Sequence, residues 1–287
     1  MKKQLSTALI IMVGIFISQN AYCQIETEKI EFISEGNRLN AELFFPLLDT
    51  VSPAIVLMHG YPGGEGDPLG LAKKLSALGI IAFVFNYQGT WSSEGDFNFE
   101  NSMIDARNAV RLLKQKNIAE KFKIDTSNIV IGGYSFGGAM ALAGAIYYSE
   151  IQRIIAIGGP NEAVYARKML ANKSVYNMFL NMFKSFEYPD GPIKVNSELW
   201  INNFLNDYQK LDLILHSDSL KNKDILLIGG WDDQNVLLEE HQIPLYRKLN
   251  AIGASRIKLL AFKTDHSFNG VKNNMAQEIY DWIFEKN

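Results

Sequence analysis

The sequence predicts an α/β fold with a mostly parallel central sheet and helices on both of its faces. Short runs of consecutive apolar residues recur along the chain, as in strands that are buried on both sides. Segments with helical apolar spacing lie between these runs. Strands and helices that alternate in this order are typical of parallel sheets.

The first expected element is an antiparallel hairpin, with strands at 28–33 and 39–45 on either side of Gly36-Asn37. The apolar runs predict further strands at 54–58, 80–85, 129–131, 154–157, 225–228 and 257–262. The helical patterns lie at 69–78, 103–116, 139–148, 238–249 and 275–284.

Residues 161–222 carry no strand pattern, and we expect them to form a helical lid inserted over the carboxyl ends of the strands, where open α/β sheets bind ligands. An apolar stripe at helical spacing runs from Val175 to Phe186, and the loop at 188–192 ends it. We predict that Met178, Met182 and Phe183 of this stripe line a substrate pocket, since methionine adapts to varied apolar ligands. The plainer alternative is a helix that packs its apolar face on the body of the protein.

The first 23 residues have the pattern of a secretory signal, with two lysines, an apolar run at 8–17 and small residues at Ala21 and Cys23. The run is too short to span a membrane, so we expect cleavage after Cys23, no stable membrane span, and a secreted or periplasmic domain at 24–287. Lipid anchoring through Cys23 is the alternative, although Tyr22 fits it poorly.

Composition excludes several classes of function. A net charge of −3 argues against a nucleic-acid partner, which requires a basic surface. The single cysteine and four histidines offer no spacing typical of a metal site. We therefore expect neither a metal nor a cofactor, and we leave the oligomeric state open.

The segment Gly133-Tyr134-Ser135-Phe136-Gly137 has the pattern of a nucleophile elbow, in which a serine sits on a sharp turn between a strand and a helix. Glycines two positions before and after the serine relieve clashes across the turn. The helix that follows directs its amino terminus toward the site, which favours a developing oxyanion. Ser135 is therefore the expected nucleophile.

A serine nucleophile needs a base, and the base needs an acid to orient it. Among the histidines, His266 lies on a loop directly after the last expected strand, at the correct edge of the sheet. The acid is expected after the strand at 225–228, where Asp232 and Asp233 compete. The backbone N–H groups of Phe136 and Tyr61 are the expected oxyanion donors. A triad in the order serine, aspartate, histidine has the chain order of α/β-hydrolases.

At these positions the sequence resembles the α/β-hydrolase superfamily, and within it the dienelactone-hydrolase and prolyl-oligopeptidase-like serine hydrolases of bacteria. The resemblance rests on four motifs and spans roughly residues 30–285. They are His59-Gly60-Tyr61-Pro62-Gly63, Gly133-Tyr134-Ser135-Phe136-Gly137-Gly138, Gly230-x-x-Asp233-x-x-Val236 and Asp265-His266-Ser267-Phe268. It implies an α/β-hydrolase fold and favours Asp233 as the acid. Gln88 stands where these relatives usually carry arginine.

The expected activity is hydrolysis of a small ester through a serine acyl-enzyme, as in a carboxylesterase. A peptidase acting on short peptides is the alternative within the same fold, and it requires a carboxylate such as Glu94, Asp96 or Glu162 to hold the free amine of the substrate. An inactive binding module is the alternative from another class. It usually lacks a triad residue, whereas all three are present here.

Overall fold

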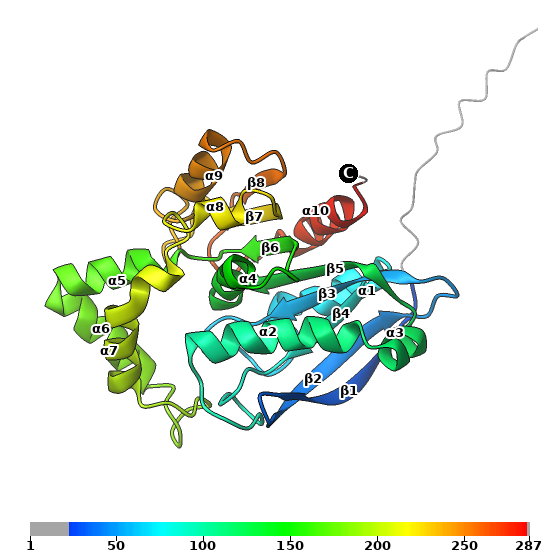
Figure 1. Cartoon of the computed structure of the whole chain (residues 1–287), viewed down its shortest axis with the longest axis horizontal. Helices are drawn as coiled ribbons and strands as arrows, with labels where there is room; N and C mark the ends of the chain where they lie inside the picture. The colour runs from blue at the N-terminus through cyan, green and yellow to red at the C-terminus, as the bar shows by residue number, and fades with distance from the viewer. Residues whose placement is uncertain (1–22, 286–287) are drawn as a thin grey trace, which may run out of the picture.

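The computed structural model describes residues 23–285, so the predicted signal of residues 1–23 falls outside the described residues except for Cys23. An eight-stranded sheet runs through the described chain in the order β1-β2-β4-β3-β5-β6-β7-β8 (Figure 1). The strands are β1 (Ile25–Ser34), β2 (Asn37–Pro46), β3 (Ser52–Met58), β4 (Ile81–Phe85), β5 (Ile124–Tyr134), β6 (Arg153–Ile157), β7 (Asp224–Gly230) and β8 (Ile257–Phe262).

The sheet is antiparallel at one edge and parallel elsewhere. Strands β1 and β2 form the expected hairpin, joined through Glu35 and Gly36, which both have positive φ. Strand β2 also pairs antiparallel with β4, whereas the pairs from β4 through β8 are all parallel. Every residue of β3, β4 and β7 is buried, as the unbroken apolar runs predict.

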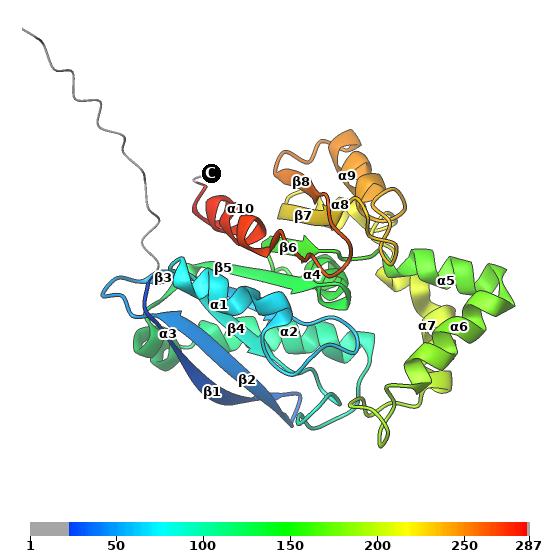
Figure 2. The ribbon, with the colours of Figure 1, turned by 180° about the vertical axis from the view of Figure 1, so that it is seen from behind.

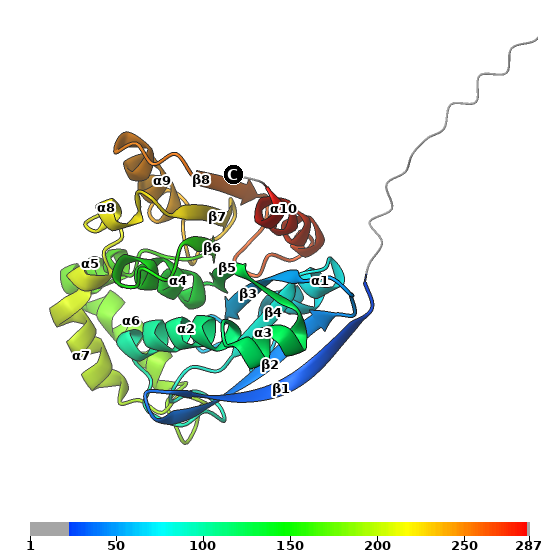
Figure 3. The same ribbon diagram turned by 45° about the vertical axis from the view of Figure 1, so that its right-hand side comes forward.

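Helices cover both faces of the sheet, which confirms the predicted fold class. The helices are α1 (Leu71–Ala77), α2 (Phe99–Leu113), α3 (Lys116–Phe122), α4 (Phe136–Tyr147), α5 (Glu162–Ala171), α6 (Lys173–Lys184), α7 (Ser197–Asp207), α8 (Ser217–Leu220), α9 (Gln242–Ala251) and α10 (Lys272–Phe284), with 3-10 turns η1 (Pro68–Gly70) and η2 (Tyr208–Leu211). Helices α1 and α10 pack on one face, and α2 and α4 pack on the other (Figures 2 and 3). No helix within residues 23–285 is long and apolar enough to cross a bilayer.

Several helical boundaries differ from those expected from the sequence, and the starts of α2 and α9 have a local cause. Helix α2 begins at Phe99 rather than at 103, because the Asn98 side chain caps it by accepting a hydrogen bond from the Asn101 N–H at 2.7 Å. Helix α9 begins at Gln242 rather than at 238. This start places Pro244 in the first turn, where a missing N–H costs no helical hydrogen bond.

Helix α3 was not predicted from the sequence. It has only seven residues, too few for apolar periodicity to be recognised. Its one buried residue, Phe122, packs edge-on against Phe45 of β2 with ring centroids 5.3 Å apart. Packing against the hairpin, rather than local sequence, accounts for this helix.

The 161–222 segment folds into α5, α6, α7, η2 and α8, without a strand of the sheet (Figure 1). Helices α5, α6 and α7 gather at one end of the sheet. The expected loop at 188–192 interrupts them and pairs with the body of the protein. The backbone N–H of Trp91 donates to the Pro192 carbonyl at 2.8 Å, and the backbone N–H of Lys194 donates to the Gly89 carbonyl at 2.7 Å.

A buried histidine directly before α9 is hydrogen-bonded to the start of this segment. His241 is 2% exposed, and its Nδ1 accepts a hydrogen bond from the Asn161 N–H at 3.1 Å. Burial lowers the pKa of His241 to about 4, so the imidazole is neutral near pH 7 and can accept this bond. Asn161 in turn caps α5 and donates its Nδ2 to Asp212 at 3.0 Å.

Replacing His241 by asparagine should flatten the pH dependence of stability. A histidine whose folded pKa lies below its unfolded value of about 6.5 destabilises the fold as pH falls from that value toward 4, because the unfolded chain binds the proton more readily. For His241 the loss between pH 7 and pH 5 is about 2 kcal/mol. The asparagine side chain retains an oxygen acceptor but does not titrate.

The measurement is urea unfolding of the wild type and His241→Asn at pH 7 and pH 5. The variant should lose about 2 kcal/mol less than the wild type between the two pH values. The comparison concerns the pH slope, so a constant loss of packing in the variant cancels. Equal slopes in the two proteins would contradict the proton linkage of His241.

Candidate active site at the carboxyl edge of the sheet

Ser135 lies on the turn between β5 and α4 with φ 54° and ψ −119°, a conformation that is strained for a residue other than glycine. The flanking glycines make this turn possible. A Cβ at Gly133 would lie 2.3 Å from the carbonyl carbon of Gly137, and one at Gly137 would lie 2.5 Å from the oxygen of Met58. The Ser135 N–H donates to the Ile157 carbonyl at 2.8 Å, which fastens the turn to β6.

Three side chains from separate loops form a hydrogen-bonded row. The Ser135 Oγ lies 3.0 Å from Nε2 of His266, and Nδ1 of His266 lies 2.7 Å from Oδ2 of Asp233. A carboxylate at Nδ1 holds the proton on that nitrogen and leaves Nε2 free to accept the serine proton. The structure thus brings together the three residues that the sequence indicates.

Asp233, and not Asp232, contacts the imidazole. Asp233 is 1% exposed, and its second oxygen accepts the N–H groups of Asn235 and Val236 at 2.9 Å each. Asp232 is exposed, and its N–H donates to the Thr264 carbonyl. The two adjacent aspartates therefore face different surroundings.

Tyr134 contacts the loop that carries His266. Its hydroxyl donates to the His266 carbonyl at 3.0 Å, and its ring lies 5.0 Å from the imidazole, centroid to centroid. Burial, together with the charges of Asp233 and Asp265, raises the pKa of Tyr134 to about 12, so the hydroxyl remains a donor at neutral pH. Sequence reasoning missed this role, although the position next to Ser135 was the available signal.

The two expected oxyanion donors flank Ser135. Phe136 is the first residue of α4, where helical geometry leaves the backbone N–H without an intrahelical partner. Tyr61 follows Gly60, whose backbone abuts the serine, since a Cβ at Gly60 would lie 3.1 Å from the Ser135 Cβ. The loop after β3 and the elbow therefore meet backbone to backbone.

His59 fixes the loop that carries Tyr61. It is 3% exposed, its Nδ1–H donates to the Gly60 carbonyl at 2.7 Å, and its own carbonyl accepts the Tyr87 hydroxyl at 3.0 Å. Burial lowers the pKa of His59 to about 4, so the His59 imidazole is neutral near pH 7. His59 thus has a structural part beside the site.

The ring of Tyr61 lies within an aromatic cluster shared by the body and the 161–222 segment. Trp200 of α7 stacks on it with centroids 5.8 Å apart and planes 9° apart. Phe183 of α6 meets it edge-on at 4.9 Å. From the body, Phe97 and Phe136 lie at 5.6 and 6.3 Å. The helical segment thus packs directly on the residue that is expected to bind the oxyanion.

The three predicted substrate-contacting residues separate into two groups. Phe183 is 9% exposed and belongs to the aromatic cluster around Tyr61. Met178 and Met182 remain 59% and 40% exposed on α6. Only Phe183 of the three is thus placed against a residue of the expected oxyanion hole, and substrate contact stays a prediction for all three.

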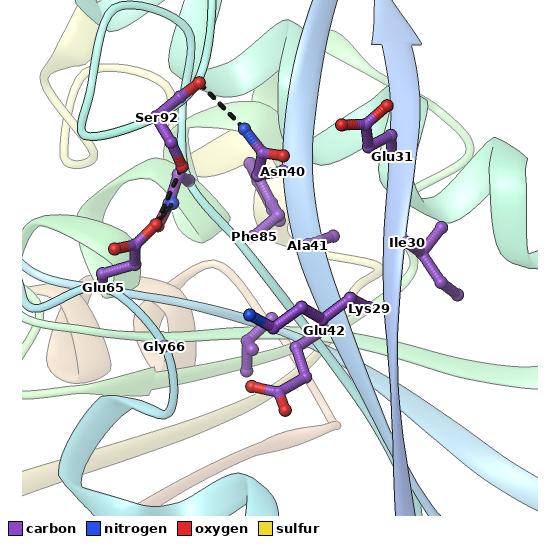
Figure 4. A pocket seen from close by; sticks show the side chains of 12 residues that line it. Lys29, Ile30, Glu31, Asn40, Ala41, Glu42, Glu65, Gly66, Phe85 and Ser92 are labelled. Atoms are coloured by element: carbon purple, nitrogen blue, oxygen red, sulfur yellow. Dashed lines mark hydrogen bonds between the residues drawn. The ribbon is translucent and has the colours of Figure 1, made fainter.

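A cavity of about 570 Å³ lies elsewhere, beside β1, β2 and β4 (Figure 4). Glu65 belongs to its lining, and the Glu65 carboxylate accepts hydrogen bonds from the Asn86 side chain at 3.2 Å and from the Ser92 hydroxyl at 2.8 Å. The lining includes none of the three side chains Ser135, His266 and Asp233, which together are called the Ser135 row. Within residues 23–285, no three His, Cys, Asp or Glu side chains gather as metal ligands.

Comparisons with known proteins agree with this architecture. Est1E from Butyrivibrio proteoclasticus superposes with a TM-score of 0.62 at 15% identity, over 90% of this chain and 98% of that one. The Pyrococcus furiosus esterase Pf2001 does so with a TM-score of 0.64 at 16% identity, over 95% and 96%. At these identities the likeness concerns the fold.

Sequence relatives cover less of the chain. The quorum-quenching protein AidA of Acinetobacter baumannii is 28% identical over 132 residues, which are 44% of this chain and 42% of that protein. The chain thus aligns with less than half the length of this curated relative. The model of the family described as BAAT / acyl-CoA thioester hydrolase C terminal matches residues 108–268, more than half of the chain. With the fold and this match together, the chain belongs to the α/β-hydrolase superfamily, in the family of BAAT / acyl-CoA thioester hydrolase C-terminal domains.

Proposed function

We propose that this protein is a serine hydrolase that cleaves small carboxylic esters through an acyl-enzyme. The observation that carries the proposal is the row of hydrogen bonds from Asp233 through His266 to Ser135. A serine hydroxyl in this setting is activated as a nucleophile without a metal or an organic cofactor. The name of one structural relative, the Pyrococcus furiosus esterase Pf2001, supports the same class of reaction.

The reaction proceeds in two halves. The Ser135 Oγ attacks the ester carbonyl carbon while Nε2 of His266 takes the hydroxyl proton. The N–H groups of Phe136 and Tyr61 bind the resulting oxyanion. Collapse of the tetrahedral intermediate breaks the bond to the alcohol, which leaves with the proton from His266. Water then attacks the acyl-serine by the same route and releases the acid and the free Ser135.

The surroundings of Tyr61 favour an apolar acyl group. Phe183 and Phe186 meet its ring at 4.9 and 6.0 Å, so rings from α6 and the loop after it stand beside the expected oxyanion donor. The family description adds thioesters as a class to test, because the same attack on a thioester releases a thiol. The signal pattern of residues 1–23 supports a secreted or periplasmic location for this activity.

Ser135→Ala should lower kcat/KM for p-nitrophenyl butyrate at least about ten-thousand-fold, because the nucleophile is lost. Hydrolysis is followed by release of p-nitrophenol, and a fluorophosphonate probe should label the wild type only. Circular dichroism of both proteins controls for folding. An unchanged rate in the variant would rule out the proposed reaction. Faster turnover of aminoacyl p-nitroanilides than of esters would instead favour the peptidase alternative.

The neighbouring aspartates provide a matched pair of variants. Asp233→Asn removes the carboxylate that holds the proton on Nδ1 of His266, and kcat should fall about ten-thousand-fold with little change in KM. Asp232→Asn changes the same charge at an exposed position and should stay within about threefold of the wild type. Steady-state kinetics on the same ester measure both, and equal losses would show that charge alone, and not contact with His266, matters.

A further inference from the structure

A second cavity of about 600 Å³ opens between the body and the 161–222 segment. The first turn of α2, the end of α4, and α7 with η2 surround it, and Figure 1 shows α7 beside the left-hand end of α2. No residue of the Ser135 row is part of its lining. Its volume lies within the roughly 300–1,000 Å³ typical of sites for small molecules.

Aromatic rings form most of the apolar wall of this cavity. Phe99 of α2 stacks on Trp200 of α7 with centroids 5.0 Å apart, and it lies 4.9 Å from Phe204. Tyr147 and Tyr148 contribute rings from the end of α4. Such faces carry a negative quadrupole, so they attract both flat apolar groups and cations.

Two acidic residues and one basic residue line the cavity, so the formal charge of its lining is negative. Lys210 is held by Asp207 at 2.7 Å, which neutralises both. Glu100 also lines the cavity and is exposed, and its carboxylate makes no hydrogen bond or ion pair in the described part of the chain. Arg107 lies over the Tyr148 ring but pairs with Glu35 at 3.7 Å. Lys210 attracts Glu100 from farther away, but no described residue forms a direct ion pair with Glu100, so a ligand with a positive charge can form that pair.

We propose that this cavity is a second ligand site, separate from Ser135, that binds a small organic cation with a flat apolar body, such as an arylalkyl ammonium. The ring of the ligand packs against Phe99, Trp200 and Phe204, and the ammonium pairs with Glu100 at the rim. The rings and the carboxylate are complementary to the two ends of such a molecule, whereas an aryl carboxylate meets like charge at Glu100.

Adjacent asparagines on α7 allow the cavity to be blocked with a matched control. Asn203 lines the cavity, whereas Asn202 accepts a hydrogen bond from Tyr176 of α6, and both are exposed. Asn203→Trp should fill the cavity, and Asn202→Trp places the same side chain outside it. Because both positions are exposed, neither substitution disturbs the core.

The experiment is calorimetric titration of the full chain with 1-naphthylmethylammonium, 1-naphthalenemethanol and 1-naphthoate at pH 7.5. The ammonium should bind most tightly, at least about tenfold better than the carboxylate. Asn203→Trp should weaken ammonium binding at least about tenfold, and Asn202→Trp by less than about twofold. Glu100→Gln should cost about fivefold, unlike Glu198→Gln on α7 outside the cavity.

Three results would overturn the proposal. Equal affinity for the ammonium and the carboxylate would show that Glu100 does not select charge. Equal binding by the Asn203→Trp and Asn202→Trp variants, or no binding by the wild type, would show that the cavity is not the site. None of these readouts depends on hydrolysis, so they stay informative even if the reaction proposed for Ser135 fails its own test.

Discussion

The backbone of Ser135 is the constraint around which the candidate active site is arranged. A serine at φ 54° costs about 1–3 kcal/mol relative to a relaxed conformation. Two backbone hydrogen bonds of Ser135 offset this cost. Its N–H donates to the Ile157 carbonyl, and its carbonyl accepts the Ala139 N–H. Gly133 and Gly137 allow the elbow to close on itself and on the end of β3. The strained turn therefore exists because three parallel strands and α4 hold it.

Around this turn, buried polar side chains form hydrogen bonds with loops that follow different strands, although Nε2 of His59 and the Tyr61 hydroxyl have no hydrogen-bond partner within residues 23–285. The Asp233 carboxylate, almost fully buried, accepts two backbone N–H groups and the His266 imidazole. A carboxylate in such a place would otherwise cost several kcal/mol to bury. Tyr134 and His59 serve the two neighbouring loops in the same way. Hydrogen bonds thus connect each of these loops to a neighbouring element.

Local pattern was sufficient to predict the sheet and to place Ser135 and His266 at one edge of it, because apolar runs and glycine spacing are properties of short segments. It was not sufficient where tertiary packing decides. Asp232 and Asp233 share one turn, and only the position of His266 separates them. On α6 the apolar stripe predicts a helix, yet Met178 faces solvent while Phe183 packs on Tyr61, since Trp200 and its neighbours determine which side is covered. Helix α3 lacks any sequence period of its own.

The 161–222 segment leaves the sheet at the carboxyl end of β6 and returns at the amino end of β7, its parallel neighbour. A chain that joins parallel neighbours must cross the length of the sheet, and α8, packed against α4 and α9, belongs to that return path. The segment is therefore not a detachable module. Grafting of α5 to α7 from a relative could change what covers Tyr61, whereas excision of the whole segment would leave two strands of the sheet without a connection.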